Sequence, residues 1–188
     1  MEIITNIDTW LFYLLNVGLA NPLFDKLMPF VTNAKHWMLV YVFLLGWMLW
    51  KGGTRGRIFA LVLILAITAT DQINSSLLKE WIGRIRPCHI FDDINLLVPC
   101  GGGKSFPSSH AANNFTAAVI LTAFKPKYKW LYFSIAALMA LSRVFVGVHF
   151  PLDIIFGALV GLGIGYAFAK LGKFILKKIE DRNKKITA

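Results

Sequence analysis

The chain has 188 residues, of which 56% are hydrophobic and 14% aromatic, and its formal net charge at pH 7 is +10. A soluble domain of this length cannot bury so much apolar surface, so the composition excludes an ordinary soluble globule and indicates a membrane protein with several spans. The positive charge does not indicate a nucleic-acid-binding protein, because most basic residues stand in short runs between apolar stretches, as anchors at the inner face of a membrane do.

The first 34 residues mix apolar and aromatic side chains with polar ones, and Pro22 and Pro29 interrupt them. The N-terminus shows neither the basic segment nor the cleavage site of a secretory signal peptide. This pattern predicts one or two amphipathic helices at the membrane interface over residues 1–34. The alternative is an additional span from Ile7 to Leu19, and Asp8 and Asn16 argue against it.

Five apolar stretches follow, and each is predicted to be a membrane-spanning helix. They cover about His36–Trp50, Ile58–Leu78, the segment from His110 to Phe124, Trp130–Val146 and Asp153–Leu171. A bilayer core is crossed by about 20 helical residues, so the first and third stretches are short for a span. The sequence therefore predicts a single all-α integral membrane domain over residues 1–188, with about five transmembrane helices and amphipathic interfacial helices before them.

The distribution of basic residues orients this predicted bundle. Runs of lysine and arginine lie at residues 51–57, at residues 125–129 and in the tail over residues 173–188. With five spans these three segments fall on one side, which the positive-inside rule assigns to the cytoplasm. The long loop over residues 79–109 and the short turn over residues 147–152 then lie outside.

The predicted outer loop has two further features. It contains basic residues on the side where the positive-inside rule does not expect them, and anion binding would explain their presence. These residues are Lys79, Arg84, Arg86 and Lys104. Cys88 and Cys100 lie in the same loop, and on the oxidising side of the membrane a disulfide between them would contribute about 2–4 kcal/mol. Two free thiols that never meet are the alternative.

Three polar patches lie at the outer ends of the predicted spans, at Lys79–Pro87, Ser105–His110 and Ser142–Asp153. Serine is a good N-cap, and the free N–H groups of a helix N-terminus bind phosphate readily. In the third patch, Asp153 follows His149 by four residues and can accept a hydrogen bond from its ring. Such a bond would fix the tautomer and leave the other ring nitrogen free to attack.

Together these patches supply the groups that phosphoryl transfer needs. Cations neutralise the equatorial oxygens, a nucleophile attacks the phosphorus in line, and an acid protonates the leaving oxygen. Taken singly, each basic residue would be an ordinary interfacial anchor and each histidine a capping residue. Gathered on one side of the membrane, they indicate a functional site, because charge near the membrane interior is usually functional.

The three patches resemble, in order and in spacing, the three-part signature of the type 2 phosphatidic acid phosphatase superfamily. The matching residues are Lys79-x6-Arg86-Pro87, Pro107-Ser108-x-His110 and Ser142-Arg143-x5-His149-x3-Asp153. Ser109 departs from the family pattern, which usually has glycine at this position, but the backbone of a serine can still donate a hydrogen bond.

The resemblance implies a role for each matching residue. His149 would be the nucleophile that forms a phosphohistidine, Asp153 would orient it, and His110 would protonate the leaving group and later activate water. The implied phosphate-binding residues are Lys79, Arg86, Arg143, Ser108 and Ser109. No metal and no other cofactor is implied, and the sequence shows no clustered carboxylate or cysteine site of the metal-ligand kind.

The resemblance also implies a substrate class and a location. The expected protein is a metal-independent lipid phosphatase of the bacterial inner membrane, with a lipid phosphate as its partner and its active site facing the periplasm. Lipid A 1-phosphatase is the favoured activity, and undecaprenyl diphosphate and phosphatidylglycerol phosphate are alternative substrates. Two other classes stay open, namely an anion-conducting or anion-binding membrane protein and a vanadate-dependent haloperoxidase, although the membrane spans argue against the latter.

Two further patterns concern the packing of the predicted spans. Gly157, Gly161 and Gly165 recur every four residues in the last span, which predicts a small-residue face for close contact with another helix. Asn113 and Asn114 lie one turn into the third span, where they would either bond between helices or support the site from below.

Overall fold

The computed structural model describes residues 2–187, with side chains through residue 185, so the two ends of the predicted domain over residues 1–188 lie outside this range. Within it, the chain is helical almost throughout and contains no strand, which confirms the all-α prediction. The helices are α1 (Glu2–Tyr13), the π-helical η1 (Leu14–Gly18), α2 (Pro22–Thr32), α3 (Ala34–Lys51), α4 (Gly53–Gln72), the π-helical η2 (Ile73–Leu78), α5 (Lys79–Ile82), the short 3-10 turns η3 (Pro87–His89) and η4 (Pro126–Tyr128), α6 (Ser109–Phe124), α7 (Lys129–Phe145) and α8 (Pro151–Thr187).

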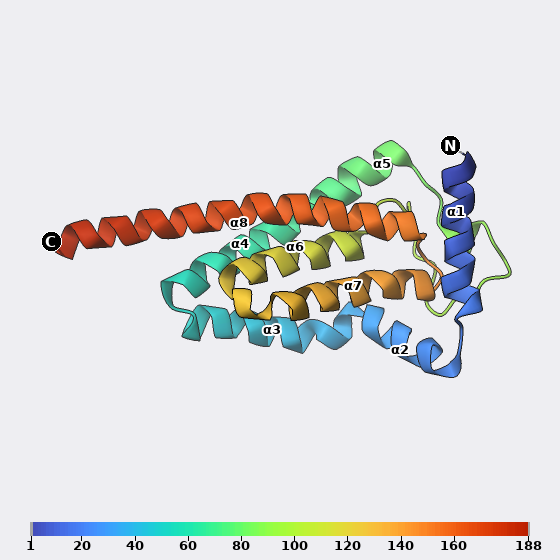
Figure 1. The fold of residues 1–188 in the computed structure, drawn as a ribbon, viewed down its shortest axis with the longest axis horizontal. Coiled ribbons are helices and arrows are strands. Elements are labelled where there is room, and N and C mark those ends of the chain that lie inside the picture. The colour runs from blue at the N-terminus through green and yellow to red at the C-terminus, as the bar shows by residue number, and fades with distance from the viewer. Residues whose placement is uncertain (1, 188) are drawn as a thin grey trace.

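Five helices, α3, α4, α6, α7 and α8, run side by side along the long axis of the molecule, with α6 in contact with α4, α7 and α8 (Figure 1). The continuous helix Gly53–Ile82 and the helix Pro151–Lys185 are each long and apolar enough to cross a membrane. The other three bundle helices have 16 to 18 residues. The prediction of a helical membrane protein is confirmed, while five as the number of spans stays a prediction.

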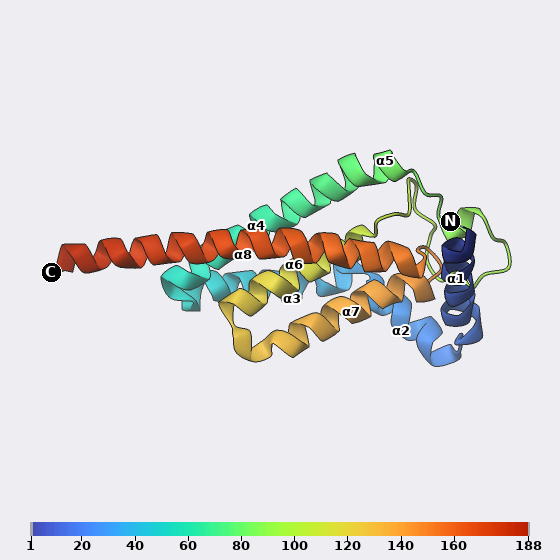
Figure 2. The same cartoon turned by 45° about the horizontal axis from the view of Figure 1, so that its top comes forward.

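The N-terminal segment does not run along the bundle as one straight helix. Residues Glu2–Gly18 and Pro22–Thr32 together have the length and hydropathy of a span, but they meet at an angle of 113°. Asn21 produces this break, because its side chain accepts the N–H groups of Leu23 and Phe24 and so starts a new helix at Pro22. In both views α1 lies across one end of the bundle (Figures 1 and 2). This geometry argues against the alternative of a straight span from Ile7 to Leu19.

Glycines allow α8 to approach α6 very closely, as the predicted small-residue face requires. A Cβ atom added at Gly157 would lie 2.5 Å from the backbone oxygen of Ser108, and one at Gly161 would lie 2.2 Å from that of Ala112. Thr116 of α6 also donates a hydrogen bond to the backbone oxygen of Gly161, at 3.1 Å. The second and third turns of α8 are therefore held directly against the beginning of α6.

Local sequence signals determine where α5 ends and where α6 and α8 begin. Gly83, with a φ of 68°, ends α5 in the left-handed conformation. Lys79 and Arg86 consequently do not share a helix face, although their spacing of seven residues, about two helical turns, would place them on one face of a continuous helix. Ser108 is the N-cap of α6 and Pro151 is the first residue of α8. The end of α5, the start of α6, the end of α7 and the start of α8 thus all point toward the end of the molecule that α1 crosses (Figure 1).

Candidate functional site

The structure brings the predicted site residues together at the end of the bundle that α1 crosses. They come from the start of α5, the loop after it, the first turn of α6, the last turn of α7, the α7–α8 turn and the first turn of α8. In that order they are Lys79, Arg86, Ser108, Ser109, His110, Arg143, His149 and Asp153. Lys79 lies close enough to Arg86, Asp153 and Arg143 to interact with all three electrostatically. His110 likewise lies close enough to the three basic residues of the site to interact with them electrostatically, namely Arg143, Arg86 and Lys79.

His149 is held by a hydrogen bond on each side of its ring. Its Nδ1 lies 3.3 Å from Oδ2 of Asp153, and its Nε2 lies 3.1 Å from Nη1 of Arg86. Because a guanidinium can only donate, Nε2 must carry the lone pair and Nδ1 must carry the proton. The ring therefore presents an unprotonated nitrogen toward Arg86 and a proton toward Asp153, as a nucleophile requires.

Burial governs the protonation state of this ring. His149 is 2% exposed, and desolvation lowers its pKa to about 3, although the hydrogen bond that its ring donates to Asp153 acts in the opposite direction. The charges of Arg143 and Arg86 lower the pKa further. His149 is consequently neutral at physiological pH, which is the form that can attack.

Three basic residues form the walls of the site without acidic partners of their own. Nζ of Lys79 donates to the backbone oxygen of Lys104, Nη1 of Arg86 to that of Val148, and Nη1 of Arg143 to Oγ1 of Thr32. Among residues 2–185, the ion pairs of the site join Arg84 and His149 to carboxylates and include none of these three cations. Burial lowers the pKa of Arg86, which shows how poorly solvated its charge is.

Two nitrogen atoms at these cations lack any partner. Nε of Arg86 and Nε of Arg143 are buried and make no hydrogen bond in the structure. A buried donor without an acceptor is costly, and a buried charge more so, unless an anion completes the site. The arrangement of Lys79, Arg86 and Arg143 therefore suits a compact anion with several oxygen atoms, such as a phosphoryl group.

The α6 N-terminus adds neutral donors to the cations. Ser108 is fully buried, and its side chain accepts the N–H of Ala111 at 3.5 Å, which leaves its hydroxyl proton free to donate. The backbone N–H groups of Ser109 and His110 lie in the first turn, where a helix offers them no acceptor. Asn74 of η2 fixes this turn by donating to the Ser109 hydroxyl, at 2.9 Å, and to the oxygen of Pro107, at 3.1 Å.

His110 stands at the same helix end, opposite α2. Its ring lies near the backbone of Thr32, the residue whose hydroxyl also holds Arg143. Asn114 donates to the backbone oxygen of His110, at 2.8 Å, while Asn113 donates to Asp71 at 3.3 Å. Asn114 thus supports the backbone of His110, and Asn113 joins α6 to α4.

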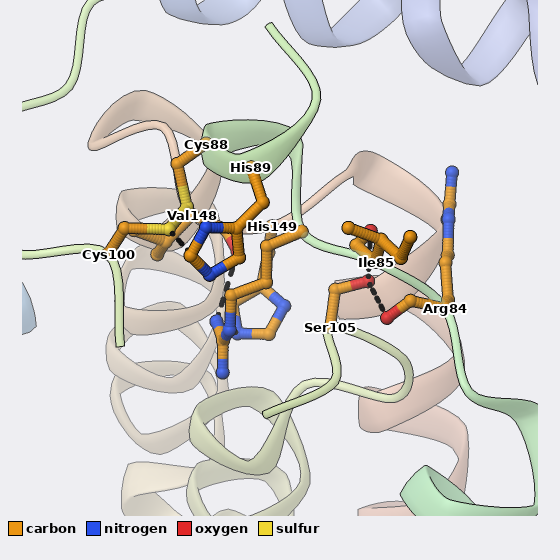
Figure 3. Close-up of a disulfide and its surroundings, with 9 residues drawn as sticks. Arg84, Ile85, Cys88, His89, Cys100, Ser105, Val148 and His149 are labelled. Carbon is orange, nitrogen blue, oxygen red and sulfur yellow. Dashed lines mark hydrogen bonds between the residues drawn. A yellow bond between two sulfur atoms is a disulfide. The ribbon is translucent and has the colours of Figure 1, made fainter. Parts of the chain in front are cut away.

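A disulfide closes the loop above the site. Cys88 and Cys100 are bonded, with their Cα atoms 6.0 Å apart, and Figure 3 shows the bridge beside His89 and His149. Farther along the same loop, Ser105 hydrogen-bonds through its N–H and hydroxyl to the backbone of Arg84, and its hydroxyl also reaches the oxygen of Ile85 (Figure 3). The segment that carries Arg86 is therefore tied down on both sides.

Sequence reasoning missed four residues that shape the site. Arg84 was expected only as an outer-loop cation, but Nη1 of Arg84 donates to Oδ1 of Asp153, at 2.9 Å. Asp8, Thr32 and Asn74 bond to site residues or to the turns that carry them. Polar residues in otherwise apolar helices were the available signal, but they did not reveal which distant partner each would meet.

Comparisons with known proteins show which family the chain belongs to. The model of the PAP2 superfamily matches residues 58–175. The chain is 33% identical over 194 residues to the lipid A 4'-phosphatase of Bacteroides thetaiotaomicron, an alignment that covers 97% of this chain and 82% of that protein. It is 32% identical over 178 residues to the lipid A 4'-phosphatase of Porphyromonas gingivalis, covering 91% of this chain and 75% of that protein.

Among solved structures, LpxE from Aquifex aeolicus aligns with a TM-score of 0.70 and 28% identity, over 87% of this chain and 95% of that one. Both the sequence matches and the structural match extend well beyond the three motif patches, into the helices that support them. The chain is therefore a membrane-embedded lipid phosphatase that belongs to the PAP2 superfamily.

Proposed function

We propose that this enzyme hydrolyses a phosphate monoester of lipid A through a phosphohistidine intermediate on His149. The observation that carries the mechanism is the hydrogen bonding of His149, which directs Nε2 at Arg86, one of the three cations without acidic partners, and the Nδ1 proton at Asp153. A phosphorus atom placed between Nε2 and these cations would be attacked in line, while the cations neutralise its oxygens.

The reaction has two steps. In the first, Nε2 of His149 forms a bond to phosphorus as the bond to the lipid oxygen breaks, and His110 gives that oxygen a proton. In the second, His110 removes a proton from water, the water oxygen attacks phosphorus, and the bond to Nε2 breaks to release inorganic phosphate. The proposal assigns the binding of the phosphate to Lys79, Arg86, Arg143, Ser108 and Ser109, which lie at the same end of the bundle as His149.

The 4'-phosphate of lipid A is the proposed target. The relatives named lipid A 4'-phosphatase align over 91% and 97% of this chain, although the sequence alone favoured the 1-phosphate. Purified protein should release phosphate from lipid A in detergent micelles, and mass spectrometry of the product should locate the lost group. Undecaprenyl diphosphate and phosphatidylglycerol phosphate, tested in parallel, measure the preference. Failure to release phosphate from any of these lipids would refute the proposal.

The same phosphate-release assay, applied to a variant of His149, distinguishes an enzyme from an anion-conducting or anion-binding protein. His149→Ala should abolish phosphate release while retaining phosphate binding, because the cations remain. An anion pathway would be insensitive to the loss of one nucleophile. Metal independence is part of the proposal, and turnover that persists in excess EDTA supports it, whereas restoration by an added divalent cation contradicts it.

The site is proposed to face the periplasm of a bacterial inner membrane. The opposite end of the bundle carries basic residues beside aromatic rings, with Lys125 lying 4.7 Å from the ring centre of Trp47 and Lys129 lying 5.0 Å from that of Trp130. Lysine and tryptophan together mark a membrane interface, and excess lysine marks the cytoplasmic one. A reporter fused to the C-terminus should therefore be active as a cytoplasmic fluorescent protein and inactive as a periplasmic phosphatase.

A further inference from the structure

A chain of buried charges connects the N-terminal helix to the nucleophile. The guanidinium of Arg84 bonds two carboxylates, with Nη2 donating to Oδ2 of Asp8 and Nη1 donating to Oδ1 of Asp153 at 2.9 Å. The other oxygen of Asp153 faces His149. Asp8 is 2% exposed and Asp153 is fully buried, so neither carboxylate is solvated. Charged groups this well buried are costly unless they form a complete network.

The remaining contacts of the network leave little freedom to its members. Oδ1 of Asp8 accepts the N–H of Leu152 at 2.8 Å, and Oδ2 of Asp153 accepts the N–H of Phe150 at 2.8 Å. The Arg84 guanidinium lies over the Phe150 ring, 4.0 Å from its centre. Asp8 therefore fixes both the arginine that contacts Asp153 and the first turn of α8 on which Asp153 stands.

The charges of the network match the needs of the intermediate. When Nε2 of His149 bonds to phosphorus, Nδ1 keeps its proton and the imidazole ring becomes positively charged. Asp8, Arg84 and Asp153 together carry one net negative charge, which stays available to that ring. Without Asp8, Arg84 would neutralise Asp153 and the charged ring would lack compensation in a buried site.

We propose that Asp8 and Arg84 are positioning residues for the nucleophile, acting through Asp153, so that α1 is a functional part of the active site. The proposal rests on the function proposed above. It goes beyond that function, because neither Asp8 nor Arg84 is one of the residues that match the family signature, and Arg84 stands at one of its unspecified positions between Lys79 and Arg86.

Asp8→Asn and Arg84→Lys test this proposal. The first removes a charge at nearly constant volume, and the second keeps the charge but cannot bond two carboxylates in the same fork. Both should lower kcat on lipid A in detergent micelles by on the order of 10- to 100-fold, with KM within about twofold, since neither residue touches the substrate. The double variant should be no worse than the poorer single variant, because both act in one network.

Two controls separate positioning from loss of structure. Tyr13→Phe removes another anchor of α1, the 2.7 Å hydrogen bond from the Tyr13 hydroxyl to Asp93, and should retain wild-type kcat. Asp8→Glu keeps the charge and should recover much of the activity that Asp8→Asn loses. If Asp8→Asn and Tyr13→Phe reduce kcat equally, or if Asp8→Asn raises KM alone, the proposal is wrong.

A spectroscopic readout keeps this test independent of turnover. In protein with ¹⁵N-labelled histidine, the Nδ1 proton of His149 should give a downfield resonance that shifts or broadens in Asp8→Asn and Arg84→Lys and not in Tyr13→Phe. An unchanged resonance in both variants would refute the positioning role. Absence of phosphate release by the wild-type protein would instead refute the proposed function, and the resonance would still decide the role of Asp8.

Discussion

Gly157 offers the sharpest test of how the fold sets the geometry of the site. A Cβ atom at this position would lie 2.5 Å from the backbone oxygen of Ser108, and ordinary contact begins at 3.4 Å. Because the obstacle is backbone, Gly157→Ala must move α8 from α6 by about 0.9 Å, at an overpacking cost of about 1–3 kcal/mol. The movement would stretch the 2.9 Å hydrogen bond from the backbone N–H of Ser108 to the backbone oxygen of Asp153.

The catalytic consequence follows from that displacement. In the proposed mechanism Ser108 starts the helix that binds phosphate and Asp153 orients the nucleophile, so parting them would misalign the two halves of the site. A misplacement of about 1 Å costs roughly 100-fold in rate. Phosphate release from lipid A in detergent micelles should therefore fall by about this factor in purified Gly157→Ala protein.

Gly163 provides the matched control on the same helix. An added Cβ there meets nothing within 4 Å, so Gly163→Ala should leave kcat/KM unchanged and should not lower the thermal unfolding temperature. Wild-type activity in Gly157→Ala, with an unfolding temperature equal to that of Gly163→Ala, would refute the account of close helix contact.

Three further predictions concern the disulfide, the cation support and pH. Cys88→Ser/Cys100→Ser should lose about 3 kcal/mol of stability and should show a thermal unfolding temperature that dithiothreitol no longer lowers, because the bridge closes a loop with a sequence separation of 12 residues. Thr32→Val removes the 2.7 Å acceptor of Arg143 and should weaken inhibition by orthovanadate by about tenfold, while an unchanged inhibition constant would show that Thr32 does not position the cation. Burial lowers the pKa of His149 to about 3, below the ordinary value of 6.5, so its contribution to stability is fully present above pH 6.5 and is lost progressively as the pH falls toward 3. Thermal unfolding between pH 7 and pH 4 should accordingly show a smaller loss of stability for His149→Asn than for the wild-type protein.

The sequence predicted much of the site because its residues stand in three local patches with recognisable spacing. His149 and Asp153 are four residues apart, and proximity along a helix start made their hydrogen bond predictable. The glycine repeat of α8 likewise predicted a close helix contact from local spacing alone. Patterns of this kind depend only on helix geometry.

The supporting residues could not be predicted, because their partners are distant in the sequence. Asp8 bonds Leu152 across 144 positions, and Arg143 bonds Thr32 across 111 positions. From the sequence, Asp8 counted only as evidence against a membrane span. Its burial against α8 depends on α1 turning across the end of the bundle, which no local pattern specifies.

Trapping the covalent intermediate tests the central claim most directly. Lipid A labelled with ³²P at its phosphates should be mixed with wild-type protein and quenched within a single turnover in alkali, where phosphohistidine survives. We predict that the label is found on His149, at Nε2, and that His149→Ala protein carries none. Label on another residue, or phosphate release by His149→Ala at the wild-type rate, would contradict the account.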